Sequence, residues 1–303
     1  MLVSRPVSSI GSSHALWRAL TVVATVCGLA LAGCRGGPTG VLVELAEARR
    51  LAADLRVQFN KASDASNRAV MADTDEASVA FAQEAEQAKQ VVQTDAATLA
   101  PHLRNLGYAN EARLLEEFTK HFADYLNLDR TVLELAVENT NLKAQRLSFG
   151  PAQLAADAFR DALAALVPVA GAKDRCHIES AVARAVLAVR EVQVLQAPHI
   201  AEADDAAMAR MEVEMGRLQA VASDCMNELS GLVEPEARLA PARSSLERFR
   251  DVSLQIVALS RRNSNVRSLA LSLREKPALV AACDDSLRAL DDALAKEGFR
   301  ATR

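Results

Sequence analysis

The stretch NTNLKAQRLS at 139–148 is written again, with conservative changes, as NSNVRSLALS at 263–272. Both copies lie inside long segments with helical periodicity, although helix interiors disfavour asparagine because its amide competes for backbone hydrogen bonds. The match extends without a gap over 122–149 and 246–273, which is an offset of 124 residues. A match of this length indicates that one helical unit occurs twice in the chain.

A second pair of matching segments, 71–80 and 200–209, supports the duplication. Their offset is 129 residues, and the five-residue difference falls between the two matching blocks, in stretches that contain proline and glycine. Insertions are tolerated in such loops. The sequence therefore predicts two repeats, 41–168 and 172–299, with the joint between Pro168 and Gly171.

The composition predicts an all-α protein. The 303 residues are 50% hydrophobic and only 4% aromatic, with few glycines and prolines, and no alternating run typical of a strand is found. Each repeat divides into four helices with short connections, as in up-down-up-down four-helix bundles. The expected helices are 41–72, 74–99, 109–148 and 151–167, then 172–200, 203–232, 243–273 and 277–297. The predicted fold is two tandem up-down-up-down four-helix bundles, placed either side by side or end to end.

Residues 1–33 are predicted to be a lipoprotein signal peptide and not part of the fold. Two arginines and no acidic residue accompany an apolar run that is too short to span a bilayer, and the run ends in Leu31-Ala32-Gly33-Cys34. This ending resembles the lipobox of bacterial lipoproteins, which implies cleavage before Cys34, acylation of that cysteine and a linker at 34–40. Several acyl chains attach a protein stably to a membrane. An uncleaved membrane helix or plain secretion is the alternative.

The residue after Cys34 is Arg35. An aspartate at that position is associated with retention in the inner membrane, so its absence favours the outer membrane, with the bundles facing the periplasm of a bacterial cell envelope. The net charge of −4 provides no basic surface for nucleic acid. The predicted partners are therefore the membrane, through the lipid anchor, and either a small-molecule ligand or another envelope protein.

One family resemblance rests on the third helix of each repeat. Phe118, Tyr125 and the run VLELAVENTN resemble the third helix of the four-helix-bundle sensor domain of methyl-accepting chemotaxis receptors, and Phe249 with the segment 256–265 forms a weaker second copy. The resemblance implies a sensor-type bundle. Such receptors place the bundle between two membrane helices and continue into a signalling coiled coil. This chain has no second apolar span and no such coiled coil, so the resemblance implies an input module, and no ligand-contacting residue can be transferred.

Asn139 and Asn263 are the first candidate site residues, because heptad spacing places both on the core seam of the third helix. An asparagine there costs stability but specifies register through a hydrogen-bonding partner. Alternatively, the two amides line a small-molecule pocket between helices. Asn141 and Asn265 are expected to turn to another face and to be solvated.

The cysteines predict one disulfide. Apart from Cys34 and a cysteine in the signal peptide, the chain has Cys176, Cys225 and Cys283. Cys176 lies 25 residues before the hairpin turn near residue 201 and Cys225 lies 24 residues after it, so the two are level. Disulfides are stable in an oxidising compartment. We predict a Cys176–Cys225 disulfide and a free Cys283 in the core.

No motif for catalysis, haem attachment or phosphate binding is present, and no histidine pair has the spacing of metal ligands. We therefore expect no enzymatic activity, no cofactor and no metal. The leading hypothesis is a lipid-anchored, periplasm-facing binding or sensor-type module. The alternative is a structural or scaffolding envelope lipoprotein that contacts other helical proteins.

Overall fold

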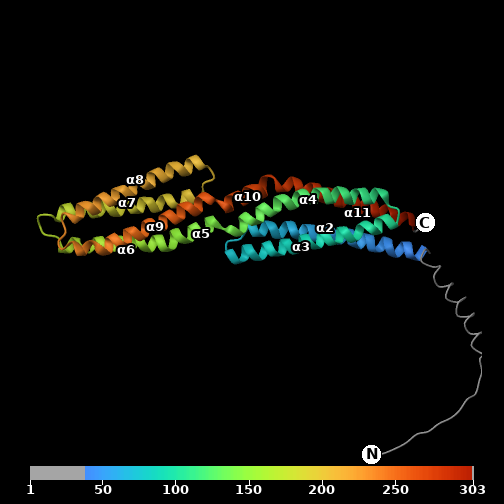
Figure 1. Ribbon diagram of the computed structural model, residues 1–303, viewed down its shortest axis with the longest axis horizontal. Coiled ribbons are helices and arrows are strands. Elements are labelled where there is room, and N and C mark those ends of the chain that lie inside the picture. The colour runs from blue at the N-terminus through green and yellow to red at the C-terminus, as the bar shows by residue number, and fades with distance from the viewer. Residues whose placement is uncertain (1–37, 302–303) are drawn as a thin grey trace, which may run out of the picture.

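The computed structural model describes residues 38–301, which form an elongated rod of helices (Figure 1). No strand occurs within these residues, and none of their helices is long and apolar enough to cross a membrane. The predicted signal peptide and the lipidation site Cys34 lie outside the described residues. The helices are α2 (Pro38–Met71), α3 (Asp75–Asn105), α4 (Ala109–Glu138), α5 (Thr140–Leu147), α6 (Gln153–Ala164), α7 (Arg175–Ala201), α8 (Asp205–Ser230), α9 (Ala240–Arg262), α10 (Ser264–Arg274) and α11 (Lys276–Ala301).

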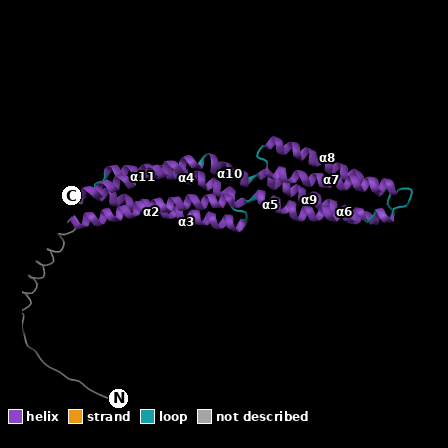
Figure 2. Cartoon of the chain, turned by 180° about the vertical axis from the view of Figure 1, so that it is seen from behind, coloured by secondary structure: helices purple, strands orange, loops and turns teal. Residues whose placement is uncertain are grey.

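The rod consists of two helical bundles placed end to end. Helices α2, α3, α4, α10 and α11 form one bundle, here called the terminal bundle because it contains both ends of the described chain. Helices α5 to α9 form the other, the distal bundle. Figure 2 shows that the turns gather at the two ends of the rod and at its middle. The predicted all-α fold with two four-helix bundles is confirmed.

The predicted domain boundaries do not coincide with these bundles. The fourth helix of the first repeat, α6, packs against α9 and α7 in the distal bundle, whereas the fourth helix of the second repeat, α11, packs against α4 and α2 in the terminal bundle. Repeats 41–168 and 172–299 therefore exchange their last helices. The short connections suggested a bundle closed within each repeat, but the third helix is long enough to pass from one bundle into the other.

The terminal bundle closes around aromatic side chains. Phe59 of α2 contacts Phe118, Phe122 and Tyr125 of α4 with ring centroids 5.3 to 6.2 Å apart and near-perpendicular planes, a favourable geometry for aromatic pairs. Buried leucines and Cys283 of α11 complete this core. The C-terminal helix is thus part of the same hydrophobic core as the N-terminal one.

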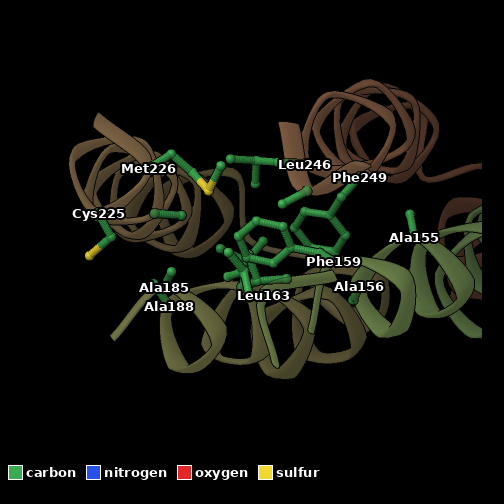
Figure 3. Close-up of a cluster of buried hydrophobic side chains, with 14 of the residues drawn as sticks. Ala155, Ala156, Phe159, Leu163, Ala185, Ala188, Cys225, Met226, Leu246 and Phe249 are labelled. Carbon is green, nitrogen blue, oxygen red and sulfur yellow. The ribbon is translucent and has the colours of Figure 1, made fainter. Parts of the chain in front are cut away.

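The distal bundle has its own core, made from all of its helices (Figure 3). Phe159 of α6 and Phe249 of α9 are fully buried and lie at its centre, and alanines of α6 and α7 leave room for them. Met226 of α8 closes one side. Because the α6 side chains lie in this core, the segment after α5 cannot return to the terminal bundle without exposing them to water.

Each long third helix is broken at its asparagine. Asn139 separates α4 from α5, and Asn263 separates α9 from α10. A five-residue π-helix, Ser148–Ala152, follows α5. A heptad seam continued from Asn139 and Asn263 in steps of three and four residues would place Phe149 and Leu273 in the core, but these side chains are 73% and 68% exposed. The seam therefore drifts beyond the two breaks. A single left-handed residue and a π turn change the helical phase, which a heptad count assumes to be constant.

Two helical hairpins, α2–α3 and α7–α8, turn at the middle of the rod. Between α2 and α3, the Thr74 hydroxyl accepts a hydrogen bond from the Ala77 amide. Between α7 and α8, the Asp204 carboxylate accepts hydrogen bonds from the amides of Ala206 and Ala207. These are N-caps, which satisfy amides that have no partner inside the helix. Both turns therefore lie beside the points where the third helices break.

The predicted disulfide is absent from the structure. Cys176 and Cys225 are free thiols: Cys176 is exposed in the first turn of α7, whereas Cys225 is buried in the distal core. Equal height along two neighbouring helices does not determine which way the side chains face, and here they face different environments. Cys283 is free and buried, as predicted.

These environments predict thiol reactivity. In the folded protein, Cys176 should react with a water-soluble disulfide reagent at a rate close to that of a free thiol. Cys225 and Cys283 should react only after unfolding, because a thiol must be exposed and ionised to react and burial raises the pKa of both. Peptide mapping after alkylation would identify the sites. A native protein in which Cys176 is unreactive until a reductant is added would contradict the structure.

Candidate functional site

Two backbone breaks define the place where the chain passes from one bundle to the other. Asn139 has φ 51° and Asn263 has φ 53°, and they are the non-glycine residues with positive φ in the described part of the chain. Asparagine is among the few residues that tolerate this left-handed conformation. Since the two broken helices run antiparallel beside each other, both breaks lie at the same level. We call residues 138–141 and 262–265 the crossover junction.

The two helices that begin at the crossover junction cap each other. The Thr140 amide donates to the Ser264 hydroxyl (3.1 Å), and the Ser264 amide donates to the Thr140 hydroxyl (3.0 Å). One residue further, the backbone amide of Asn141 donates to the side-chain oxygen of Asn265, and the backbone amide of Asn265 donates to the side-chain oxygen of Asn141, both at 3.1 Å. N-caps usually come from the residue just before the helix; here each helix takes its caps from the other.

A second set of bonds joins the asparagines to each other and to the α7–α8 hairpin. The side-chain nitrogen of Asn265 donates to the side-chain oxygen of Asn139, and the side-chain nitrogen of Asn141 donates to the side-chain oxygen of Asn263. Asn141 also donates to the Ile200 carbonyl (2.6 Å), and Asn263 donates to the Glu202 carbonyl (2.8 Å). The crossover junction thus binds directly to the turn of the distal bundle.

The bonding is not symmetric. The side-chain nitrogen of Asn263 reaches the α7–α8 turn, but that of Asn139, which is fully buried, has no partner in the structure. A buried donor without a partner costs about 1–3 kcal/mol. The α2–α3 turn is therefore less tightly attached to the crossover junction than the α7–α8 turn.

Charged and polar side chains extend the junction into the distal bundle. Arg262 and Glu138 form a two-bond ion pair across the two breaks. Buried His199 lies between the Ser260 hydroxyl and the Glu212 carboxylate, at 2.9 Å from each. A hydrogen bond from Arg261, together with that from His199, holds the pKa of Glu212 below its usual value.

The π-helix carries the next polar layer. The Ser148 hydroxyl at its start donates to Gln196 of α7 (2.7 Å), and Gln196 donates to Ser253 of α9 (3.2 Å). All three side chains are buried. Buried polar networks hold packed helices in one register because every member needs its partner. The middle of the rod is therefore polar, whereas the two ends have apolar cores.

A separate buried ion cluster lies inside the terminal bundle. The Asp129 carboxylate, fully buried, is 2.8 Å from the ammonium group of Lys89 and 2.9 Å from that of Lys276, and it accepts a hydrogen bond from Ser66. Burial alone would raise the pKa of Asp129, but the charges of Lys276 and Lys89 and the hydrogen bonds hold it below its usual value. The cluster joins α2, α3, α4 and α11 at one point.

Sequence reasoning identified part of the junction. Asn139 and Asn263 were placed at equivalent core positions, and both are buried at equivalent breaks. The expectation that Asn141 and Asn265 are solvated was wrong, because both bond across the junction. The signal was present: the pattern Asn-Thr/Ser-Asn consists entirely of residues that cap helices. The cluster at Asp129 left no such signal, because its members are spread over four helices.

Metal sites and cavities are the remaining candidate features of the described chain. No group of three or more metal-ligating side chains occurs within residues 38–301. Cavities of about 470 and 500 Å³ lie between α3 and α4, away from the asparagines of the junction. Apart from the side-chain nitrogen of Asn139, the side-chain amides of the junction bond to protein groups, and the ion cluster has a partner for each charge.

One solved structure with this fold is the sensor domain of the histidine kinase sensor TorS from V. parahaemolyticus. The two agree with a TM-score of 0.52 over 83% of this chain and 99% of the TorS domain, at 10% sequence identity. No protein-family model and no curated protein sequence matches the chain. The chain therefore shares the helical fold of that domain.

The reciprocal caps should contribute measurably to stability. We expect Thr140→Val to lower the free energy of unfolding by about 1–2 kcal/mol, because it removes the acceptor for the Ser264 amide while keeping the shape of the side chain. Thr131→Val, at an exposed position of α4, should change it by less than about 0.5 kcal/mol. Urea unfolding measures both, and equal effects would contradict the capping role.

The ion cluster predicts a pH-dependent stability. Asp129→Asn leaves the buried Lys276 without a counter-charge and Lys89 with only the more exposed Glu86, and it should cost about 3–5 kcal/mol at neutral pH. Because the folded-state pKa of Asp129 lies below the unfolded value of about 3.9, its contribution is present above that value and disappears as the pH falls through the folded pKa. The stability difference between wild type and variant should therefore narrow below about pH 4. A stability difference between wild type and Asp129→Asn that stays constant down to strongly acidic pH would contradict this role of Asp129. Asp124→Asn, at an exposed position of α4, is the control.

Proposed function

We propose that this protein is a lipid-anchored sensor-type module that faces the periplasm from the outer membrane, binds a ligand or a partner, and passes its state along the rod. The observation that carries the proposal is the likeness of 83% of the chain to a histidine kinase sensor domain. The resemblance of the third helices to chemoreceptor sensor bundles supports the same class.

The arrangement of the helices supports attachment at one end. Both ends of the described chain lie at the tip of the terminal bundle (Figure 1), and Cys34 precedes Pro38 by only four residues. A lipid anchor at Cys34 would therefore hold the terminal bundle next to the membrane and direct the distal bundle away from it. The distal bundle is then the part available to molecules in the surrounding compartment.

The crossover junction offers a route for the signal. Two helices cross from the distal into the terminal bundle, so a shift of α5 or α9 moves α4 or α10 with it. We infer a second arrangement in which the unpartnered side-chain nitrogen of Asn139 bonds to the α2–α3 turn while bonds at the α7–α8 turn loosen. A ligand shifts such an equilibrium by its difference in affinity for the two states.

The natural thiols provide a test of sensing in the full chain. A thermal-shift screen against amino acids, organic acids and aromatic acids should find a ligand that raises the melting temperature. Saturation with that ligand should change the alkylation rate of Cys283, in the terminal bundle, by several-fold. In Asn141→Ala the ligand should still raise the melting temperature, but the change at Cys283 should be reduced. The absence of any ligand across the set would count against sensing.

A scaffold function is the alternative, and the filled cores of both bundles favour it. A rod with apolar ends and a bonded middle is a stiff spacer, and such a spacer would contact other helical envelope proteins without a ligand. In that case a protein partner would change the melting temperature and the reactivity of Cys283, and no small molecule would do so. The same two readouts therefore separate the two functions.

The anchor is tested on its own. Cells that express the full chain should incorporate a labelled fatty acid into it, and Cys34→Ala should abolish the label because no thiol remains for acylation. The Cys176→Ser variant is the matched control, since it removes a thiol that is exposed in the folded chain, and it should label normally. Label that persists in Cys34→Ala would contradict lipidation at Cys34 but would not bear on the sensor function.

A further inference from the structure

A groove runs along the outer face of the terminal bundle, between α3 and α4. The cavity of about 470 Å³ lies toward the α3–α4 turn, and the cavity of about 500 Å³ lies toward the crossover junction. On α3 the two cavities are lined from Val79 to Arg104, a distance of about 38 Å at 1.5 Å per residue. A small ligand would fill a fraction of this length, whereas a helix of another chain would fill all of it.

The lining of the groove suits close contact with helices. Its floor is apolar, with Phe118 and Phe122 of the aromatic core at one end and Leu133 at the other. Its walls are largely alanines, whose small side chains let a second backbone approach. These alanines are Ala82, Ala96, Ala97, Ala100, Ala112 and Ala123. Glutamines of α3 also line the groove and can form hydrogen bonds to a partner.

Charged side chains at the two ends of the groove have no ion-pair partner among residues 38–301. Arg104 and Glu116 line the first cavity, and Arg130 and Glu134 line the second. All four are exposed, and none of them forms an ion pair within the described residues, although the neighbouring Glu86 is paired with Lys89. Each end thus carries one unpaired basic and one unpaired acidic side chain. A surface with both signs at each end is complementary to a copy of itself.

We infer that the α3–α4 groove is the interface of a symmetric dimer of this chain. In a two-fold interface, if one residue of the first copy contacts a different residue of the second copy, the same two residues also meet with the copies exchanged. Arg104 of one copy then faces Glu116 of the other, and the reverse pair forms as well. The apolar floor and alanine walls supply the buried centre and the unpaired charges supply the rim, which is the usual anatomy of a protein interface.

The orientation of the dimer rests on the proposed anchor. Two chains attached to one membrane at Cys34 lie parallel, so the two-fold axis runs along the rod and equivalent positions of α3 lie at the same level. The existence of the dimer does not depend on the anchor, because the groove and its charges are complete within residues 79–137. The parallel orientation, and with it the Arg104–Glu116 pair, rests on the anchor, whereas the use of this face as the interface does not.

Cross-linking in cells tests the interface on the full chain. Ala97→Cys lines the groove, and Thr98→Cys is the adjacent exposed position of α3 outside it. Both are made with Cys176→Ser to remove the exposed natural thiol, and cells are treated with a flexible bis-maleimide that spans about 10 Å, the width of one helix. Ala97→Cys should give several-fold more cross-linked dimer than Thr98→Cys. Equal yields, no dimer, or a cross-link to a different protein would overturn the proposal.

A charge exchange tests the predicted pair directly. Arg104→Glu should lower the yield of cross-linked dimer at Ala97→Cys by about fivefold, because like charges then face each other. The double variant Arg104→Glu, Glu116→Arg restores opposite charges and should restore the yield. Arg248→Glu, at an exposed position of the distal bundle, should leave the yield unchanged. Unfolding curves of each variant confirm that it is folded, and a double variant as weak as the single one would contradict the pairing.

Discussion

The rod depends on one constraint: two helices that begin in the middle of the molecule must satisfy their first amide groups, and each does so with side chains of the other. A helix start leaves backbone donors without partners, and water does not reach residues as buried as Thr140 and Ser264. The reciprocal bonds solve this problem for both helices at once. Neither helix can be displaced without exposing unpaired donors on both, so the two bundles are linked at this point.

The duplication explains why such a solution is available. Every bond of the reciprocal set joins residues 124 positions apart, which is the offset between the two copies of the repeated phrase. The copies are therefore not two separate sites. They are the two halves of one site that is complementary to itself, with the Arg262–Glu138 ion pair at the same offset. An arrangement of this kind arises when two identical units meet about a two-fold axis, and the exchange of α6 and α11 between the repeats follows from it.

The sequence predicted the helical class, the repeat and the positions of most helices, because periodicity and caps are local signals. It did not predict which bundle each fourth helix joins, since that depends on whether the third helix turns back at Asn139 or continues. Thr140 and Asn141 carried a readable signal as capping residues, but their partners are far away in the sequence. The Asp129 cluster and the orientation of Cys176 depend on the rotation of helices about their axes, which spacing along the chain does not determine.

The polar middle of the rod and the apolar cores of its two ends have different structural roles. Each bundle packs around its own core, while the crossover junction connects the two through hydrogen bonds in which the side-chain nitrogen of Asn139 has no partner. Amide hydrogen exchange of the full chain, resolved at Thr140, Asn141, Ser264 and Asn265, tests this account most directly. The account predicts that these four amides exchange as slowly as those of the helix interiors, and that Thr140→Val speeds exchange at Ser264 across the junction. Exchange as fast as at a frayed helix end would contradict it.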